Sequence, residues 1–379
     1  MNMEISIKDT NHSIVIPNQS VTYLHELREL LDQAERNQTN NFANFSDLDM
    51  IYWFLYEEKH VDENDERSER STISYKSELE QFCTYLVRYA ADIGIDIKGL
   101  KEGSLFKSLQ PRHLLRYQEW LEESSPYVQQ GKNYSKATLE RKTTVLRMFF
   151  NYLYAKGYIS ESLTSRMKIV RTKSNDRPNR DMVPKDVVRV LDAFIKTKNA
   201  FMFTLVQTLV TTGLRNEELC KLTVGSVKQK PLGDGYYIEV HGKGNKKRNI
   251  PLRDKVVQSI EIFRGLRGLP SINNSNPEDP LFTTSKGKAY SPPYLSKLFS
   301  KEMEKIAPYL DGITLTCTPH VFRHAFAIIS HYNEVDVFSI MRSLGHEKIE
   351  TTMIYLQKSM ELDQHASNYW RSDMLNNLI

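Results

Sequence analysis

Hydrophobic residues recur at steps of three and four through much of the chain, a spacing that is typical of amphipathic helices. The first clear stretch begins at Ser71 and carries one apolar face, made of Tyr75, Leu79, Phe82, Tyr85, Leu86 and Tyr89. Further helices are predicted from Pro111 and from near Ser135, because proline favours the first helical position and serine the position before it. Together these segments predict a helical domain over residues 67–170.

A polar and basic stretch, residues 171–185, comes next and contains Pro178 and Pro184, which is typical of an interdomain linker. Residues 200–211 then predict a buried helix, since the stretch is too short and too rich in threonine to span a membrane. Two stretches, 236–240 and 248–252, flank a Gly-Lys-Gly-Asn turn and predict a β-hairpin. We therefore expect a mainly α protein with a small β-sheet, whose second, mixed α/β domain covers residues 186–379.

Charge is unevenly distributed between the N-terminal residues and the rest of the chain. Residues 1–66 hold 4 Lys/Arg and 14 Asp/Glu, a balance of −10, whereas the whole chain carries +4, so the rest carries +14. Within this acidic extension we expect a helix at 21–35 and an aromatic-rich segment at 47–56, followed by a charged connector at 57–70. A basic body suggests a polyanionic partner such as nucleic acid, although an ordinary solvated surface can have the same balance.

Composition excludes several classes of protein. The 379 residues are 40% hydrophobic and 26% charged, which is ordinary for two or three globular domains and argues against disorder or a membrane protein. The N-terminus lacks the basic start and apolar run of a signal peptide. Three cysteines, Cys83, Cys220 and Cys317, lie far apart without CxxC spacing, which fits a reducing compartment. We expect a soluble, intracellular protein with no membrane partner.

Three separated segments carry unusual chemistry. In the first, Arg215 follows Gly213-Leu214, so it can point into a cleft. In the second, Thr318 and Pro319 start a helix that holds His320 and Arg323 on one face, where the helix N-terminus favours an anion. In the third, Tyr355 lies nine residues after His346. Each segment alone has an ordinary reading as a solvated helix face or a half-buried core residue. Their occurrence in this order, with Lys243 on a hairpin tip between them, favours a single site.

A metal site is the other reading of the histidines. His320, His324, His331 and His346 have no cysteine or carboxylate at ligand spacing, so we predict no metal site. His324 shares the helix face of His320 and is interpreted as structural.

The ordered set Arg215, Lys243, His320-x-x-Arg323, His346 and Tyr355 resembles the tyrosine recombinases of the Xer and phage-integrase type. The segments TTGLRNEEL, VHGKGNKKRNIPL, TPHVFRHAFA and LGHEKIETTMIY are similar to the motifs of this family. The resemblance covers roughly residues 70–360 and implies a two-domain DNA clamp, with a SAM-like core-binding domain ahead of the catalytic domain. Residues 1–66 are not part of the usual pattern.

The resemblance implies site-specific recombination, in which Tyr355 attacks a DNA phosphodiester to form a 3′-phosphotyrosine link. A free tyrosine has a pKa near ~10 and is hardly ionised at neutral pH, so the attack needs a strongly positive site. Arg215 and Arg323 are expected to clamp the phosphate, because guanidinium groups bind its oxygens at two points. Lys243 is implied as general acid. No cofactor is required, since the phosphotyrosine stores the bond energy for religation.

The remaining candidate residues are expected to assist the cleavage reaction or to contact DNA. His320 is expected to handle the proton of the nucleophile, His346 to donate a hydrogen bond to the phosphate, and Glu218 to orient Arg215 or His320. Predicted DNA contacts come from a basic helix and from the hairpin, although a solvated face is the ordinary reading of the helix. These residues are Lys136, Arg141, Lys142, Arg147, Lys246 and Lys247.

The expected partner is double-stranded DNA with a specific inverted-repeat site, and an accessory protein is possible. An apolar tail helix over residues 356–379 can fold back on its own domain or dock in a neighbour, and the resemblance favours docking within a homo-tetramer. Alternatives are a type IB topoisomerase or telomere resolvase, a DNA-binding protein that no longer cuts, and chance motifs in a basic helical protein. The sequence names neither the target site nor the biological role, which could be dimer resolution, integration, excision or inversion.

Overall fold

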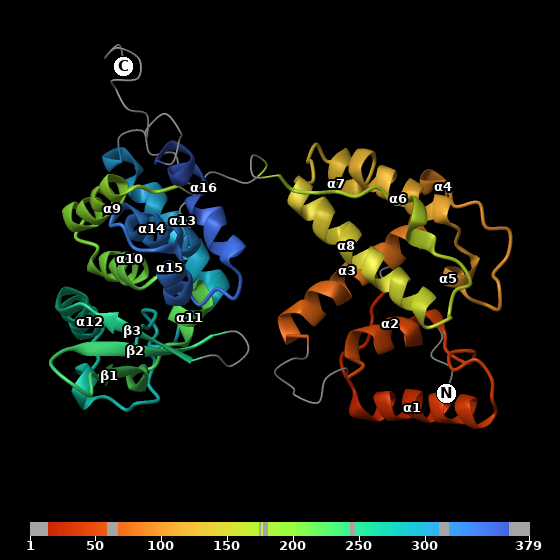
Figure 1. Ribbon diagram of the computed structural model, residues 1–379, viewed down its shortest axis with the longest axis horizontal. Coiled ribbons are helices and arrows are strands. Elements are labelled where there is room, and N and C mark those ends of the chain that lie inside the picture. Colours follow the sequence, from red (N-terminus) through yellow and green to blue (C-terminus); the bar gives the residue numbers. More distant parts are fainter. Residues whose placement is uncertain are drawn as a thin grey trace, which may run out of the picture. The chain divides into compact units, whose positions relative to one another are not determined.

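The chain folds into two compact units, Met1–Arg177 and Pro178–Ile379, whose division falls inside the predicted linker 171–185 (Figure 1). The computed structural model describes residues 14–58, 67–173, 176, 181–242, 247–310 and 318–363. Among these residues, no helix is both long and apolar enough to cross a membrane.

The first unit is helical in its described part. Its helices are α1 (Val21–Arg36), α2 (Asp47–Tyr56), α3 (Glu69–Arg88), α4 (Ala90–Ile93), α5 (Leu105–Ser108), α6 (Pro111–Glu123), α7 (Pro126–Gln129) and α8 (Lys136–Ala155). The helix starts predicted at Pro111 and Ser135 are confirmed: Pro111 is the first residue of α6, and the Ser135 side chain caps α8. Aromatic rings meet edge-to-face in the core, where Phe82 and Phe106 contact Phe150.

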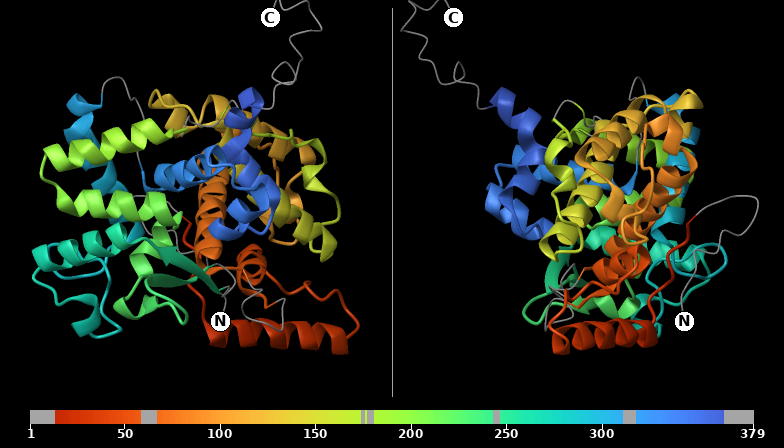
Figure 2. Two further views of the ribbon diagram at one scale, coloured as in Figure 1. Left: turned by 60° about the vertical axis from the view of Figure 1, so that its left-hand side comes forward. Right: turned by 90° about the vertical axis from the view of Figure 1, so that its right-hand side faces the viewer.

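The acidic N-terminal segment shares this core. All residues of α2 from Met50 to Leu55 are buried, and α2 contacts α1, α3 and α8. The carboxylate of Asp47 accepts hydrogen bonds from the backbone N–H groups of Leu105 and Phe106, and so holds the start of α5. α1 lies along the outside of the unit (Figure 2). Residues 14–58 and the helical domain predicted from residue 67 therefore form one packed body.

The second unit is mainly helical with a small antiparallel sheet, which confirms the predicted fold class. Its helices are α9 (Pro184–Lys196), α10 (Ala200–Thr212), α11 (Asn216–Lys221), α12 (Asp254–Leu266), α13 (Pro292–Ile306), α14 (Pro319–Tyr332), α15 (Val337–Leu344) and α16 (Ile349–Asp363). The strands, in the order β1-β2-β3, are β1 (Val227–Gln229), β2 (Tyr236–His241) and β3 (Lys247–Leu252). The predicted hairpin is confirmed, with His241 opposite Lys247, whereas the three-residue β1 was not anticipated.

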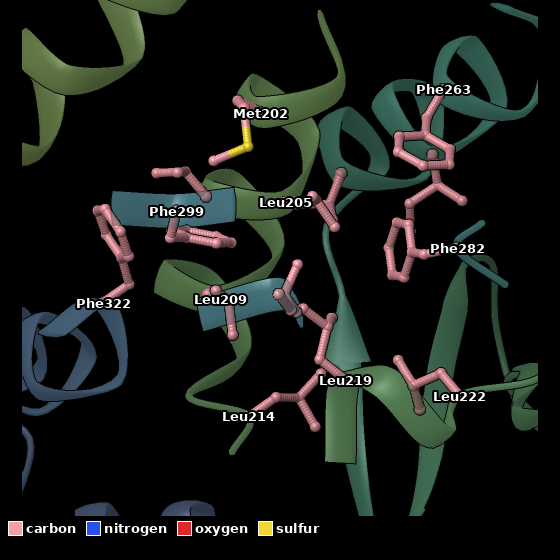
Figure 3. Packing of buried hydrophobic residues seen from close by; sticks show 14 of the residues in the cluster. Met202, Leu205, Leu209, Leu214, Leu219, Leu222, Phe263, Phe282, Phe299 and Phe322 are labelled. Atoms are coloured by element: carbon pink, nitrogen blue, oxygen red, sulfur yellow. The ribbon is translucent and has the colours of Figure 1, made fainter. Parts of the chain in front are cut away.

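Helix α10 is central to the second unit. It contacts α9, which lies beside it (Figure 2), as well as α12 and α14. Met202, Leu205 and Leu209 of this helix belong to a core that also includes Phe299 and Phe322 (Figure 3). A smaller, separate cluster joins Ala327, Ile340, Leu344 and Leu356, which places α15 and α16 against the second half of α14. The candidate site lies where α10 and α15 end and where α14 and α16 begin.

Candidate active site

Arg215 is held at a sharp turn after α10. Gly213 ends this helix with a φ of +63°, and a Cβ atom there would lie 2.9 Å from side-chain carbons of Leu344 and Phe326, so only glycine fits. The Arg215 guanidinium donates to Glu218 (Nη1 to Oε1, 2.9 Å) and to the carbonyl of Gly345 (3.0 Å). Its side chain is 35% exposed. Arg215 is therefore fixed by two acceptors yet open to a ligand.

Arg323 lies behind it and is completely buried at 0% exposure. Its guanidinium donates to the carbonyl oxygens of Gly213 and Leu344, the residues at which α10 and α15 end. Helix C-termini carry partial negative charge, so they are good acceptors for a buried cation. Burial, and then the neighbouring charge of Arg215, lower the pKa of Arg323 to about 10, which still leaves it charged at neutral pH. Its Nε–H has no hydrogen-bond partner among the described residues.

His346 contacts Arg323 directly. Nη2 of Arg323 lies 2.9 Å from Nε2 of His346, and Nδ1 of the same ring lies 2.8 Å from the hydroxyl of Thr352. Burial, and after it the charges of Arg323 and Arg215, lower the pKa of His346 to about 3. The ring is therefore neutral at pH 7. The hydrogen bond from His346 to the phosphate that the resemblance implies stays a prediction.

Tyr355 lies among three histidine rings. Its hydroxyl is 3.4 Å from Nε2 of His320. Its ring centroid is 5.9 Å from that of His320, 5.4 Å from that of His346 and 4.5 Å from that of His324. His324, interpreted from the sequence as structural, is thus the nearest of the three rings, and its Nδ1 lies 3.6 Å from Asp181. The half-buried Tyr355 side chain packs beside the small cluster of α14, α15 and α16.

Sequence reasoning missed Arg248. This arginine forms a two-point ion pair with Glu218, in which both nitrogen–oxygen distances are 2.8 Å. The sequence places Arg248 in the predicted strand 248–252 without a role, but β3 alternates, and Ile250 and Leu252 on the same face are buried. Because side chains alternate between the two faces of a strand, this pattern predicts that Arg248 points inward, on the same face as Ile250 and Leu252. Burial raises the pKa of Glu218, but the hydrogen bonds from Arg248 and from the backbone N–H of Arg215 outweigh it and lower this pKa to about 2.

The structure thus brings together six of the predicted site residues from segments far apart in sequence: Arg215, Glu218, His320, Arg323, His346 and Tyr355. Lys243 and Lys246 lie outside the described residues. Lys247 is exposed at the start of β3. Within the described ranges, no group of three or more His, Cys, Asp and Glu side chains could hold a metal ion.

The basic residues of α8 differ in their surroundings. Lys136 is exposed and pairs with Asp176, while Arg141 is exposed and pairs with Glu78. Arg147 donates to the carbonyls of Met167 and Lys168. Lys142 is only 8% exposed, and its ammonium group is held by Glu78 and Gln81. The side chains of Lys136 and Arg141 are thus exposed, whereas that of Lys142 is buried in a structural pairing. All four DNA contacts stay predictions.

Comparison with known proteins agrees with this geometry. Residues 180–361 match the phage integrase family, and residues 52–169 match the phage integrase SAM-like domain. The chain is 30% identical over 237 residues to tyrosine recombinase XerC of Thermodesulfovibrio yellowstonii, covering 59% of this chain and 72% of that one. It is 31% identical over 252 residues to tyrosine recombinase XerD of Oceanobacillus iheyensis, covering 64% and 78%.

Solved structures share the fold. The XerH site-specific recombinase bound to palindromic difH substrate has a TM-score of 0.59 at 18% identity, covering 94% of this chain and 99% of that one. The Tn1549 transposon integrase in complex with transposon right end DNA has a TM-score of 0.53 at 19% identity, covering 83% and 98%.

The chain therefore belongs to the tyrosine recombinase family, as the resemblance predicted. It is a site-specific DNA recombinase, an enzyme that cleaves and rejoins DNA strands.

Proposed function

We propose that Tyr355 is the nucleophile of this recombinase. Its phenolic oxygen attacks the scissile phosphorus, the bond to the 5′ oxygen breaks, and a 3′-phosphotyrosine link and a free 5′-hydroxyl result. The observation that carries the proposal is the position of the Tyr355 hydroxyl, 3.4 Å from Nε2 of His320 and among three histidine rings. Religation reverses the step, when a 5′-hydroxyl attacks the phosphotyrosine and returns the electron pair to the tyrosine oxygen.

Negative charge on the phosphate is stabilised by two arginines. Arg215 is partly exposed and presents its guanidinium at the surface of the site. Arg323 is buried, and its unpartnered Nε–H is the donor that remains for an oxygen arriving in the site. Preorganised donors of this kind are worth most where water is excluded. Glu218 orients Arg215 through hydrogen bonds to its backbone N–H and to Nη1.

Two proton transfers complete the step. His320 takes the proton of the Tyr355 hydroxyl, since its Nε2 lies 3.4 Å from that oxygen. The 5′ oxygen must gain a proton as it leaves, and the family resemblance gives this role to Lys243. Lys247, exposed on β3, and Lys246 contact phosphates nearby.

DNA is the partner of the chain. We propose that its target is a specific inverted-repeat site and that four copies of the chain assemble on paired sites. A solved structure of the same fold, a lambda integrase tetramer bound to a Holliday junction, has a TM-score of 0.53 at 14% identity. α16 extends beyond Tyr355 to Asp363, and the rest of the predicted tail helix lies outside the described residues. An accessory protein and a cytoplasmic, nucleoid-associated location belong to the same proposal.

The test is covalent trapping without added metal. Purified protein is mixed with sheared DNA of its host, and adducts that survive SDS are recovered and sequenced. We expect adducts on a short inverted repeat with the native chain and with Tyr332→Phe, a control at the exposed end of α14. Tyr355→Phe should bind the same DNA without any adduct. Undiminished adduct formation by Tyr355→Phe would refute the assignment, and binding without adducts by the native chain would favour a DNA binder that needs a partner to cut.

A further inference from the structure

A pocket of about 590 Å³ opens on the first unit, where α1, α2 and the end of α8 meet. Helix α1 contributes Leu31 and Glu35 to its lining, the connection to α2 contributes Asn41 and Phe42, and α2 contributes Trp53. Its volume lies in the usual range of ligand pockets. The match to the SAM-like domain begins at residue 52, so most of these residues precede the part of the chain that matches the family. The pocket is thus a feature that the shared fold does not account for.

The lining of this pocket combines aromatic rings with charged groups. Phe42 and Trp53 are both 5% exposed, and the indole Nε1–H of Trp53 has no acceptor among the residues that the structure describes. Lys156 places its ammonium group 5.8 Å from the centre of the Phe42 ring and 3.2 Å from the Glu57 carboxylate. A cation thus already lies over this aromatic wall, as cation–π attraction favours. Because the lining holds the carboxylates of Glu35 and Glu57 and one ammonium group, its charge balance is negative.

The surface beside the pocket is acidic as well. Glu26, Glu29 and Asp32 are exposed at intervals of three along α1, and residues 1–66 together carry a balance of −10. A negative surface of this kind repels the phosphates of DNA and attracts basic segments. The pocket therefore suits a group that is both cationic and partly apolar, which describes the long side chains of arginine and lysine.

We propose that this pocket binds a basic segment of a partner protein. The cationic head of an arginine or lysine pairs with the carboxylates of Glu35 and Glu57, while its apolar stem packs on Leu31 and Phe42. A backbone carbonyl of the same segment supplies an acceptor for the Trp53 indole. The inference goes beyond the proposed function and does not rest on it, because the residues assigned to the cleavage step all lie in the second unit.

Trp53 reports on occupancy of the pocket directly. The probe is a blocked hexapeptide of alternating arginine and leucine, and a matched peptide with citrulline in place of arginine keeps the shape without the charge. In proton–nitrogen NMR spectra of the full chain labelled with ¹⁵N-tryptophan, the indole signal lost in Trp53→Phe identifies Trp53. We expect the arginine peptide to shift this signal saturably while that of Trp120 stays in place, and the citrulline peptide to shift neither. An unchanged Trp53 signal, or an equal shift with citrulline, would overturn the proposal.

Two matched variants separate the pocket from general attraction to the acidic surface. Asn41→Arg places a positive charge in the lining, whereas Asn44→Arg makes the same change at an exposed position outside it. With a fluorescein-labelled arginine peptide, we expect Asn41→Arg to weaken binding by about tenfold or more and Asn44→Arg by less than about twofold, since like charges at close range are costly. Equal affinities of the two variants would overturn the proposal. Displacement of the peptide by spermidine at an equal concentration would do the same, because the pocket would then bind free amines and not a protein segment.

Discussion

Removing the guanidinium of Arg248 should damage both the stability of the second unit and its chemistry. Arg248 and Glu218 form a two-point ion pair with side-chain exposures of 14% and 6%, so the pair is largely shielded from water. The same carboxylate accepts from the backbone and side chain of Arg215. Arg248→Met therefore leaves a buried carboxylate with Arg215 at 2.9 Å and the more distant Arg323 at 4.0 Å as its cationic partners, and it lets Arg215 lose its orientation.

The size of the effect follows from burial. Removing one member of a buried ion pair costs about 3–5 kcal/mol, because the other charge is left without compensation. Arg215 continues to satisfy part of the Glu218 carboxylate, so we expect Arg248→Met to lie at the lower end, about 3 kcal/mol. Arg248→Lys should recover only part of this, since an ammonium group cannot make the parallel two-point contact. Arg253→Met, at an exposed arginine, should cost little.

The assay must report on the second unit. The three tryptophans, Trp53, Trp120 and Trp370, lie in the first unit or in the tail, so tryptophan fluorescence is unsuitable. Hydrogen exchange with mass spectrometry on peptides from α10 measures the opening free energy of the second core directly. A double-mutant cycle with Glu218→Gln then isolates the pair. A loss below about 1 kcal/mol in Arg248→Met, or a coupling energy near zero, would refute the reasoning.

Two further predictions concern the same site. The pKa of Glu218 is about 2 in the folded chain against 4.5 for a free side chain, so its ionised form stabilises the fold above pH 4.5, and we expect about 3 kcal/mol to be lost as the pH falls toward 2. Hydrogen exchange against pH measures this, and an equally steep loss in Glu218→Gln would contradict it. Gly213→Ala should lower the melting temperature of the second unit clearly more than Gly287→Ala, because both have positive φ but only Gly213 also meets Leu344 and Phe326. Equal shifts in the two variants would show that the close contact does not matter.

Local signals account for the elements that were predicted correctly. Spacing of apolar residues and terminal residues such as Pro111 and Ser135 act within a few residues, so they can be read from the sequence. The same holds for the hairpin, whose two strands are close in sequence, with His241 paired to Lys247. The three-residue β1 carries one buried side chain, Val227, which is too little for any periodic signal.

The contacts that the sequence could not give are long-range. Arg323 donates to the carbonyl of Gly213, which lies 110 residues earlier in the chain. Helix α2 looks like an aromatic segment of an acidic extension, but its burial depends on α3 and α8 packing around it. His346 lies between Arg323 and Thr352, which contact opposite nitrogens of its ring. Motifs identify such residues, and only packing decides what each one does.

Peptide mapping of the covalent adduct tests the central claim most directly. After nuclease and trypsin digestion of trapped complexes, mass spectrometry should find the nucleotide on the peptide of residues 349–358, in which Tyr355 is the sole tyrosine. The account predicts that this peptide alone carries the modification and that fragmentation places it on Tyr355. A nucleotide on any other peptide would show that a different residue attacks DNA and would contradict the account.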